Sequence, residues 1–433
     1  MNRKKTSWNR LPALTPEASW RVASRHALLP NNLPKPFTPF GNGRSYGDVC
    51  LTDRGSLILT ESLDHFIEFN PEAGLLCCEA GVRLSDVIDL IIPYGWLLPS
   101  LPGTSFATVG GAVANDVHGK NHHFMGTFCH HVTNLELLRS DGNVINCGPQ
   151  ENSEWFHATV GGLGLTGLIR RVELQLMPIK GPWMDVMSES FACLDDFWEV
   201  NSVSESTSPY VVSWVDCLSK GRGRGRGVTF KADHAPMVGK LGKSHKRFFN
   251  VPIEFPVSPI NKFSLKFFNK MYYSRHRGFS RCYQNIYSYF FPLDRIRNWN
   301  RVYGSRGFYQ YQCVLPPNNS EEATAELLNI ISSKEQGSFL AVLKTFGNRK
   351  SLGMLSFARP GTTLALDFPN TGSDVLKLLK SLDAVVQEAG GALYPAKDAR
   401  MPASLFRLSF PLWESFSKFV DPNFSSAFWR RVT

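Results

Sequence analysis

Residues 39–48 read Pro-Phe-Gly-Asn-Gly-Arg-Ser-Tyr-Gly-Asp, and two more glycine-dense stretches follow at 102–118 and 160–167. The second reads Pro-Gly-Thr-Ser-Phe-Ala-Thr-Val-Gly-Gly-Ala-Val-Ala-Asn-Asp-Val-His, and the third reads Val-Gly-Gly-Leu-Gly-Leu-Thr-Gly. Because glycine has no Cβ, backbone N–H groups in such loops approach a ligand closely, and a nest of these donors suits a pyrophosphate. One loop of this kind can equally be a tight surface turn. Three of them predict a long ligand that lies extended against the backbone.

The order of the glycines excludes two common nucleotide-binding motifs. The first loop lacks the Gly-x-Gly-x-x-Gly spacing, between a strand and a helix, that marks a Rossmann dinucleotide site. It also lacks the Gly-Lys-Ser/Thr end of a P-loop. Arg44 adds a positive charge beside the glycines, which again favours a phosphate-bearing ligand.

The composition describes a folded, basic protein. Its 433 residues include 47 Lys+Arg against 37 Asp+Glu, a net charge of +10, which favours an anionic partner such as phosphate, acidic lipid or nucleic acid. With 43% hydrophobic residues the chain is not disordered. No run approaches the ~18 apolar residues of a membrane-spanning helix, and the basic N-terminus lacks the apolar core of a signal peptide. The 9 cysteines form no Cys-x-x-Cys pair, which favours a reducing, cytoplasmic setting.

Short apolar segments separated by turns predict mixed helix and sheet over residues 1–180. Ser85 is expected to cap a helix that runs to Ile92. Asp141-Gly142 is a hairpin signal between two of the expected strands, and Pro178 and Pro182 mark a domain boundary. The expected strands are 57–60, 75–79, 133–139, 144–147 and 172–176.

From residue 307 the pattern predicts a β-α-β-β-α-β unit with both helices on one face of its sheet. Ser320 and Ser373 are expected to cap the helices, and Gly390 and Gly391 end the second one. The expected strands are 308–315, 338–346, 363–368 and 393–394. Residues 185–300 resist such a reading and are expected to be loops. They include a basic run at 220–227, the basic residues Lys240, Lys243, Lys246 and Arg247, and an aromatic-rich stretch at 263–291. No internal repeat is evident.

Taken together, these motifs resemble the FAD-dependent oxidoreductases of the vanillyl-alcohol oxidase type, whose flavin domain is called PCMH-type. Within that family the chain is most similar to the members that act on a polyprenyl-phosphate-linked pentose. The resemblance runs from about Phe40 to the C-terminus. Its specific motifs are Gly43–Asp48, His118–His123, Ala158–Gly167, Trp299–Arg301, Gln310–Gln312, Lys344–Gly347 and Tyr394–Asp398.

The resemblance implies an α+β fold in two parts. Residues 1–180 and the C-terminal return segment 392–433 would form a PCMH-type FAD-binding domain. Residues 181–391 would form an inserted α+β substrate (cap) domain built on an antiparallel sheet. The implied FAD contacts are Gly41, Asn42, Gly43, Arg44, Ser45, Tyr46, Gly47, Asp48, Gly103, Thr108, Val109, Gly110, Gly111, Asn115, Asp116, Val117, His118, Ile169 and Tyr394.

Many relatives attach FAD covalently through a His in the first loop, and some add a Cys from the second loop region. Residues 39–49 contain no His, and Cys129 is the only Cys near the second loop. We therefore expect non-covalent FAD.

The implied reaction is oxidation of a secondary sugar hydroxyl, at C2 of the lipid-linked pentose, as the first half of an epimerisation. Hydride passes from carbon to flavin while the hydroxyl proton leaves, and Lys397 is the leading catalytic candidate, with Tyr46 and His118 second. The implied substrate-binding residues are Lys120, Gln310, Gln312 and Lys344. Gln310 and Gln312 share one strand face by period two, and Tyr309, Tyr311 and Cys313 share the other.

The expected partners follow from the same reading. The chain lacks a Rossmann site, so a separate NAD(P)H-dependent short-chain reductase would reduce the keto product. A lipid-linked substrate implies peripheral contact with the inner membrane through residues 220–247 and 263–291. The sequence departs from the family at Ala365 and Thr363, which replace a Cys and an Asn, and at Phe290, which replaces a Tyr. These changes also leave open a free sugar as substrate.

Other interpretations remain. An aldonolactone or alditol oxidase on the same fold would act on a soluble sugar. A non-catalytic basic protein would bind lipid or nucleic acid through 220–247, although we expect no nucleic-acid partner. The histidines at 118, 122, 123, 130 and 131 lack a familiar set of ligands for zinc, so no metal is expected.

Overall fold

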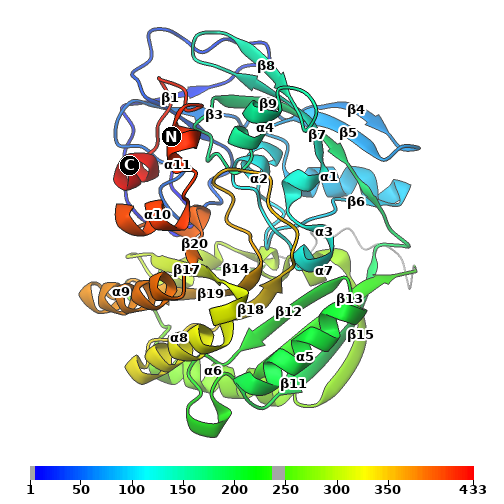
Figure 1. Cartoon of the computed structure of the whole chain (residues 1–433), viewed down its shortest axis with the longest axis vertical. Helices are drawn as coiled ribbons and strands as arrows, with labels where there is room; N and C mark the ends of the chain where they lie inside the picture. Colours follow the sequence, from blue (N-terminus) through cyan, green and yellow to red (C-terminus); the bar gives the residue numbers. More distant parts are fainter. Residues whose placement is uncertain (1–4, 237–248) are drawn as a thin grey trace.

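In a computed structural model we describe residues 5–236 and 249–433 (Figure 1). The first part of the chain holds a three-stranded parallel sheet of order β1-β3-β2 and a five-stranded antiparallel sheet of order β4-β5-β9-β7-β8. The strands are β1 (Ala18–Arg21), β2 (Phe37–Phe40), β3 (Ser56–Leu59), β4 (Phe66–Asn70), β5 (Leu75–Glu79), β7 (Val132–Leu138), β8 (Val144–Cys147) and β9 (Leu168–Gln175). A small pair joins β6 (Trp96–Leu97) to β10 (Met177–Pro178). All the strands expected before residue 180 are therefore confirmed.

Four helices accompany these sheets: α1 (Leu84–Ile91), α2 (Val109–Ala114), α3 (His122–Met125) and α4 (Ser153–Thr159). The expectation that Ser85 caps α1 is wrong, because Arg83 is the N-cap residue and Ser85 lies buried in the first turn. The backbone N–H groups of Leu84 and Ser85 donate to the carbonyls of Ala107 and Ser105, at 2.9 and 2.8 Å. The 105–107 loop thus satisfies the free N–H groups of the helix end without a side-chain cap.

The second part is an eight-stranded sheet of order β15-β11-β13-β12-β18-β19-β17-β20, in which every pair is antiparallel. Its strands are β11 (Trp183–Phe191), β12 (Tyr210–Val215), β13 (Gly227–Ala235), β15 (Phe279–Asn285), β17 (Phe308–Leu315), β18 (Val342–Phe346), β19 (Gly361–Pro369) and β20 (Ala392–Leu393). Its helices are α5 (Leu194–Thr207), α6 (Lys262–Arg275), α7 (Ile286–Phe290), α8 (Ser320–Lys334) and α9 (Ser373–Glu388). A short parallel pair, β14 (Phe249–Asn250) with β16 (Ile296–Arg297), lies outside this sheet.

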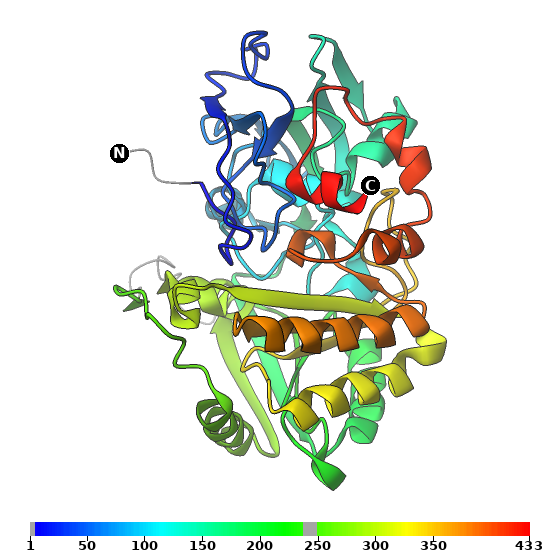
Figure 2. The same ribbon diagram turned by 90° about the vertical axis from the view of Figure 1, so that its left-hand side faces the viewer.

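The β-α-β-β-α-β unit expected after residue 307 is confirmed as β17-α8-β18-β19-α9-β20. Figure 2 shows α8 and α9 side by side on one face of the sheet. Two details differ: Ser320 and Ser373 are the first residues of their helices rather than the caps, and β18 starts at Val342.

The expectation of loops over 185–300 is wrong. These residues form β11-α5-β12-β13-α6-β15, the same order of elements as the later unit. The two units meet at their β12 and β18 edges, where Ser213 pairs with Leu343 and Trp214 with Val342. The sheet is therefore two topologically equivalent halves, although the sequence shows no repeat. The basic run at 220–227 forms a turn before β13, whereas Lys240, Lys243, Lys246 and Arg247 lie outside the described residues.

The two faces of this sheet differ in chemistry. On β17, Tyr311, Cys313 and Leu315 pack into a core with apolar side chains of α5, α8 and α9. Gln310 and Gln312 occupy the alternate positions and face the first part of the molecule. The α6 helix lies on this second face, where Tyr272 packs on Trp214 at 4.6 Å and Phe268 packs on Phe339 at 5.7 Å between ring centroids.

The C-terminal helices α10 (Ala403–Ser409), α11 (Trp413–Ser417) and α12 (Ala427–Val432) return to the first part (Figure 1). Phe424 forms a bridge with Phe37 of β2. Arg431 of α12 lies 2.7 Å from a carboxylate oxygen of Asp48 and 2.9 Å from one of Asp398. Both carboxylates are nearly inaccessible to solvent, so this arginine joins the C-terminus to the first glycine loop.

Replacing Arg431 by Met should leave two buried carboxylates without their cation and lower the free energy of unfolding by about 3 kcal/mol. Its neighbour Arg430 pairs with Asp53, which is half exposed, and Arg430→Met should cost less than about 1 kcal/mol. Urea unfolding of both variants measures the difference. Equal losses would contradict the role assigned to Arg431.

Candidate active site

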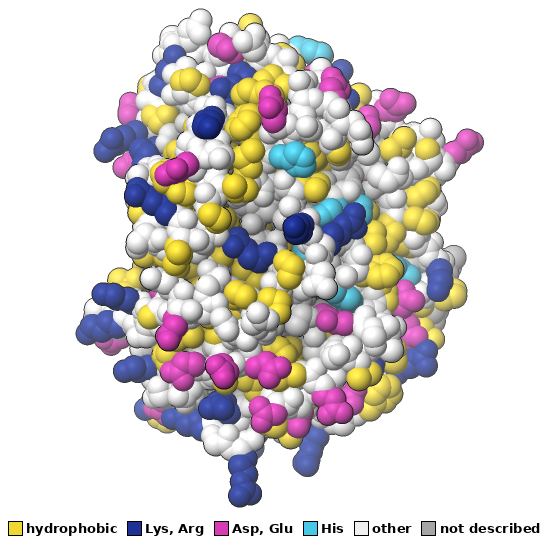
Figure 3. Space-filling model, in the orientation of Figure 1, with side chains coloured by type: hydrophobic (Ala, Val, Ile, Leu, Met, Phe, Trp, Pro, Cys, Tyr) yellow, Lys and Arg dark blue, Asp and Glu magenta, His cyan; other side chains and the backbone are white. Residues whose placement is uncertain are grey.

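A cavity of about 1010 Å³ lies between the glycine loops and the second face of the eight-stranded sheet. On the side of the molecule seen in Figure 3, Lys, Arg and His side chains gather around a hollow where the two parts meet. One wall of the cavity includes Gly41, Asn42, Gly43, Arg44, Ser45, Tyr46, Gly103, Thr108, Gly110, Gly111, Asn115, Val117, His118 and Ile169. The opposite wall includes Val212, Gln310, Gln312, Val342, Lys344, Ala365, Asp367, Tyr394 and Lys397.

Two glycines are required by how closely the loops pack. A Cβ on Gly41 would lie 2.6 Å from Oγ1 of Thr108, and one on Gly110 would lie 2.8 Å from the Cβ of Ala80. Both distances are too short for real contacts, so any side chain would push the loops apart. Both glycines line the cavity, so backbone rather than side chain forms its wall at these two positions.

The residues present fit the expected FAD. The volume is at the upper end of the ~300–1,000 Å³ typical of small-molecule pockets, as a dinucleotide requires. Within the described residues, Nε of Arg44, Oδ1 of Asn115 and Oε1 of Gln310 are buried and have no hydrogen-bond partner. Such atoms are rare because a buried polar group without a partner is costly. Since all three residues line the cavity, a large polar ligand would satisfy them.

Four of the residues expected to contact FAD do not line the cavity. Gly47 packs against the backbone of Asp398, since a Cβ on it would lie 1.5 Å from that carbonyl oxygen. Asp48 pairs with Arg431 instead of a ligand. Val109 is buried in the core beneath α2, and the carboxylate of Asp116 accepts from the hydroxyl of Ser356 at 2.6 Å. All four residues contact other parts of the protein instead of the cavity.

His118 stands at the centre of a polar chain. Its Nδ1 lies 3.0 Å from Nζ of Lys344, and its Nε2 lies 3.1 Å from the side-chain amide of Gln312. Burial, followed by the charge of Lys344, holds the pKa of His118 well below its usual value, so the ring is neutral. A neutral ring has one nitrogen without a proton, which can accept a hydrogen bond from one of these two groups. The amide nitrogen of Gln312 also donates to Oγ1 of Thr363, at 3.2 Å.

Two lysines of the cavity wall have no carboxylate partner in the described chain: Lys344 is buried and Lys120 is half-buried. Lys120 donates to the carbonyl oxygen of Tyr289, and its Nζ lies 4.0 Å from the centre of that ring. Lys344 also donates to the carbonyl oxygen of Gly119, at 2.5 Å. Burial lowers the pKa of each to about 7. An anion in the cavity would raise both pKa values again, so that both lysines carry a positive charge.

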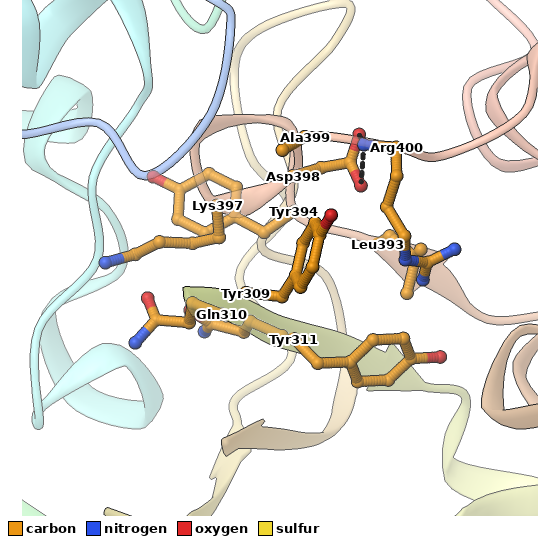
Figure 4. Close-up of a pocket in the computed structure, with 10 residues that line it drawn as sticks. Tyr309, Gln310, Tyr311, Leu393, Tyr394, Lys397, Asp398, Ala399 and Arg400 are labelled. Carbon is orange, nitrogen blue, oxygen red and sulfur yellow. Dashed lines mark hydrogen bonds between the residues drawn. The ribbon is translucent and has the colours of Figure 1, made fainter. Parts of the chain in front are cut away.

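Lys397 is the third lysine that lines the cavity; it is half-buried, and its Nζ lies 3.8 Å from the centre of the Tyr46 ring. In Figure 4, Lys397 and Gln310 extend to the same side, away from Tyr311 and Arg400. Burial lowers the pKa of Lys397, and the nearby carboxylate of Asp367 opposes that shift. Burial also raises the pKa of the Tyr46 phenol well above its usual value, so this group stays protonated.

Sequence reasoning missed two carboxylates of this site. Asp367 lines the cavity and accepts from the amide of Gln310 at 2.6 Å, and burial raises its pKa. Asp367 lies two residues after Ala365 on the same strand, so both side chains face the same side of the sheet. The alternation along the strand could therefore have predicted Asp367 from Ala365. Asp294 follows α7 and accepts from the hydroxyl of Thr104 at 2.7 Å and from the N–H and hydroxyl of Ser105 at 2.7 and 2.8 Å. No local signal marks Asp294, because its partners lie about 190 residues away in the chain.

Comparison with known proteins agrees with this geometry. Residues 18–148 match the family described as FAD binding domain. The chain is 36% identical over 409 residues to decaprenylphosphoryl-beta-D-ribose oxidase of Mycolicibacterium smegmatis, covering 90% of this chain and 88% of that protein. It is 30% identical over 374 residues to an uncharacterised protein of Streptomyces coelicolor, covering 81% and 100%. It is 31% identical over 140 residues to L-gulonolactone oxidase of Mus musculus, covering 32% and 31%.

Asp294 fixes the 103–105 loop from the opposite side of the cavity, so Asp294→Asn should weaken FAD binding. An amide offers one acceptor oxygen where the carboxylate offers two, and it turns a donor toward the donors of Ser105. Losing one charge-assisted bond of about 1.5 kcal/mol corresponds to a dissociation constant raised roughly tenfold. Titration of the apoprotein with FAD, followed by flavin fluorescence, measures it. Asp53→Asn is the matched surface control, and equal affinities in both variants would contradict this role.

Proposed function

The chain belongs to the FAD-dependent oxidoreductases with a PCMH-type flavin domain, and from this premise we propose that it oxidises the C2 hydroxyl of a polyprenyl-phosphate-linked pentose to a ketone. The name of the mycobacterial relative supports the ribose and the lipid link. The observation that carries the proposal is the convergence of Lys397, Gln310, Gln312 and Lys344 on the wall that faces the glycine loops. These are donors suited to the hydroxyl and phosphate oxygens of such a substrate.

FAD, when bound, accepts the two electrons and is reoxidised by an external acceptor, oxygen or a membrane quinone. The protein has to bind the sugar, orient it and take the hydroxyl proton. Of the three catalytic candidates, Lys397 suits the last task best, because burial has lowered its pKa and Asp367 lies close enough to stabilise the ammonium that results. Tyr46 stays protonated and lies under Lys397. His118 has both ring nitrogens engaged by Lys344 and Gln312, so we assign it a positioning role.

We propose that FAD is held without a covalent bond. Cys129 is fully buried and does not line the cavity, and burial raises the pKa of its thiol well above its usual value. Cys50 does line the cavity, but burial raises the pKa of its thiol to about 12, so this thiol stays protonated and unreactive.

The proposed domain boundaries follow from the same resemblance. We assign residues 1–180 and 392–433 to the flavin domain and 181–391 to the substrate domain, although the first two residues of the return segment, in β20, pair with β17 in the sheet of the substrate domain. The contacts of α12 with the first glycine loop support this assignment. A second half-reaction, reduction of the ketone by a separate NAD(P)H-dependent short-chain enzyme, would complete an epimerisation. Across the described residues no helix is long and apolar enough to cross a membrane. We propose a cytoplasmic protein that meets the membrane peripherally.

A soluble sugar is the second candidate substrate. The similarity to a gulonolactone oxidase over 140 residues favours it. The side chain of Ala365 is also smaller than the family's Cys, so the space for the substrate differs from that of the family. The two candidates differ in their need for the lysines of the cavity wall, because a free sugar carries no phosphate.

Lys397→Met tests the proposed chemistry. The variant should keep its flavin absorbance, while the rate of flavin bleaching by polyprenyl-phosphoryl ribose under anaerobic conditions should fall about 10²–10⁴-fold, the usual contribution of a general base. Acid precipitation of the same samples should leave the yellow colour in solution. The exposed Lys380→Met is the control. A bleaching rate in Lys397→Met equal to that of the wild type would refute the assignment.

The affinity for a phosphate-bearing ligand should fall as the pH rises. Lys120 and Lys344 have pKa values of about 7 in the empty cavity, so both are charged below that pH and lose their protons above it. Inhibition constants for inorganic sulfate, whose own charge is constant over this range, should therefore rise about tenfold or more between about pH 6 and about pH 8. Lys344→Met should flatten this profile. A flat profile in the wild type would favour a soluble, uncharged sugar.

A further inference from the structure

The segment 249–283 concentrates the exposed apolar surface of the described chain. It holds 9 of the 19 large apolar side chains that are exposed to solvent. They are Phe249, Ile253, Phe255, Val257, Phe263, Phe267, Met271, Phe279 and Tyr283. Scattered exposed apolar residues need no explanation, but a contiguous group marks an interaction surface.

The α6 helix is apolar on two sides, which an ordinary surface helix is not. Its inner side packs on the sheet through Phe268 and Tyr272. On its outer side Phe263, Phe267 and Met271, each four residues after the last, are 73%, 71% and 52% exposed. We call this stripe the α6 face. The start of the helix is stabilised by Asn261, whose side-chain oxygen accepts from the N–H groups of Phe263 and Ser264 at 2.9 and 3.1 Å.

The charge around the α6 face is mostly positive, although Glu335 pairs with two of its lysines. Residues 249–283 include six Lys and Arg and a single acid, Glu254, which pairs with Arg10. Lys262 and Lys266 flank the stripe and contact Glu335 at 3.2 and 2.6 Å, while Lys270 is exposed beside Met271. A second copy of this chain would bring the same positive charge against it. An anionic lipid surface complements it instead.

The α6 face also lies above one end of the cavity. Tyr272, from the inner side of the helix, lines the cavity, and so do Val212, Phe290, Leu340 and Val342. Apart from Lys120, whose Nζ lies 5.8 Å from the centre of the Phe290 ring, this end is apolar. The other polar residues proposed to act on the sugar lie toward Lys397. A ligand with a polar head and a long apolar chain would place the chain beneath α6.

We propose that the α6 face docks on an anionic lipid bilayer. Phe263, Phe267 and Met271 enter the headgroup boundary and Lys270 meets the lipid phosphates, so that the apolar end of the cavity is brought to the membrane surface. The route of the lipid chain rests on the proposed function, whereas the docking itself does not.

Sedimentation with vesicles tests the docking. Full-length protein carrying FAD is mixed with vesicles of phosphatidylcholine alone or with phosphatidylglycerol added. The wild type should bind the phosphatidylglycerol vesicles and release as salt is raised. Phe263→Ser/Phe267→Ser/Met271→Ser should bind them more than tenfold more weakly, while Leu376→Ser/Leu408→Ser/Leu412→Ser, which removes three exposed apolar side chains elsewhere, should bind like the wild type. Flavin absorbance and the melting temperature confirm that both variants fold.

Several outcomes would overturn the proposal. The wild type could fail to sediment with phosphatidylglycerol vesicles, or the α6 variant could bind them as the wild type does. A dimer of the wild type in gel filtration that the α6 variant lacks would show that the face joins two copies. The vesicles contain no sugar substrate, so a negative result leaves the proposed oxidation standing, and an inactive enzyme leaves the docking result valid.

Discussion

The alternation of side chains along the eight-stranded sheet constrains everything else in this molecule. The strands β17, β18 and β19 present apolar groups to the core under α8 and α9 on one face and line the cavity with the other. On β17 four consecutive residues supply Tyr311 and Cys313 to the core and Gln310 and Gln312 to the site. A slip of one residue would exchange the two sets. The positions of the proposed substrate-binding residues are therefore fixed by core packing rather than by contacts within the site.

Burial makes the site sensitive to what it holds. Three lysines lie in the cavity wall, and burial lowers the pKa of all three. Without a ligand their charges are costly to keep, since few opposite charges lie near them. Two pairs of polar side chains in the wall are hydrogen-bonded to each other, Gln310 with Asp367 and His118 with Lys344. Such pairing rigidifies the wall before a ligand arrives, which reduces the ordering required on binding.

The sequence predicts the parts of this fold whose periodicity is unambiguous. The unit from β17 to β20 has strands and helices with one apolar side each, and its order follows from the residues alone. The segment around α6 does not, because Phe263, Phe267 and Met271 are apolar on the outside while Phe268 and Tyr272 are apolar on the inside. A helix with two apolar sides has no clear 3.6-residue pattern. Ser85 fails as a cap for another reason: distant carbonyls satisfy the helix end. Asp294 belongs to the same class, since tertiary structure alone brings it to Ser105.

The two halves of the sheet have the same topology but contribute different kinds of side chain to the cavity wall. The half built from β17, β18 and β19 contributes Gln310, Gln312, Lys344 and Asp367. The half built from β11, β12 and β13 contributes Val212, and beside it Phe290 and Tyr272 close the apolar end. A duplicated scaffold thus produces a gradient from polar to apolar along one cavity. Hydrogen bonds are directional, so the polar end of such a cavity would fix the orientation of an amphiphile's head group. The free energy of burying apolar surface depends mainly on area, so the apolar end would accept the chain in several positions. That combination suits the proposed reaction, in which one carbon atom of a sugar is placed closely while the attached lipid can vary.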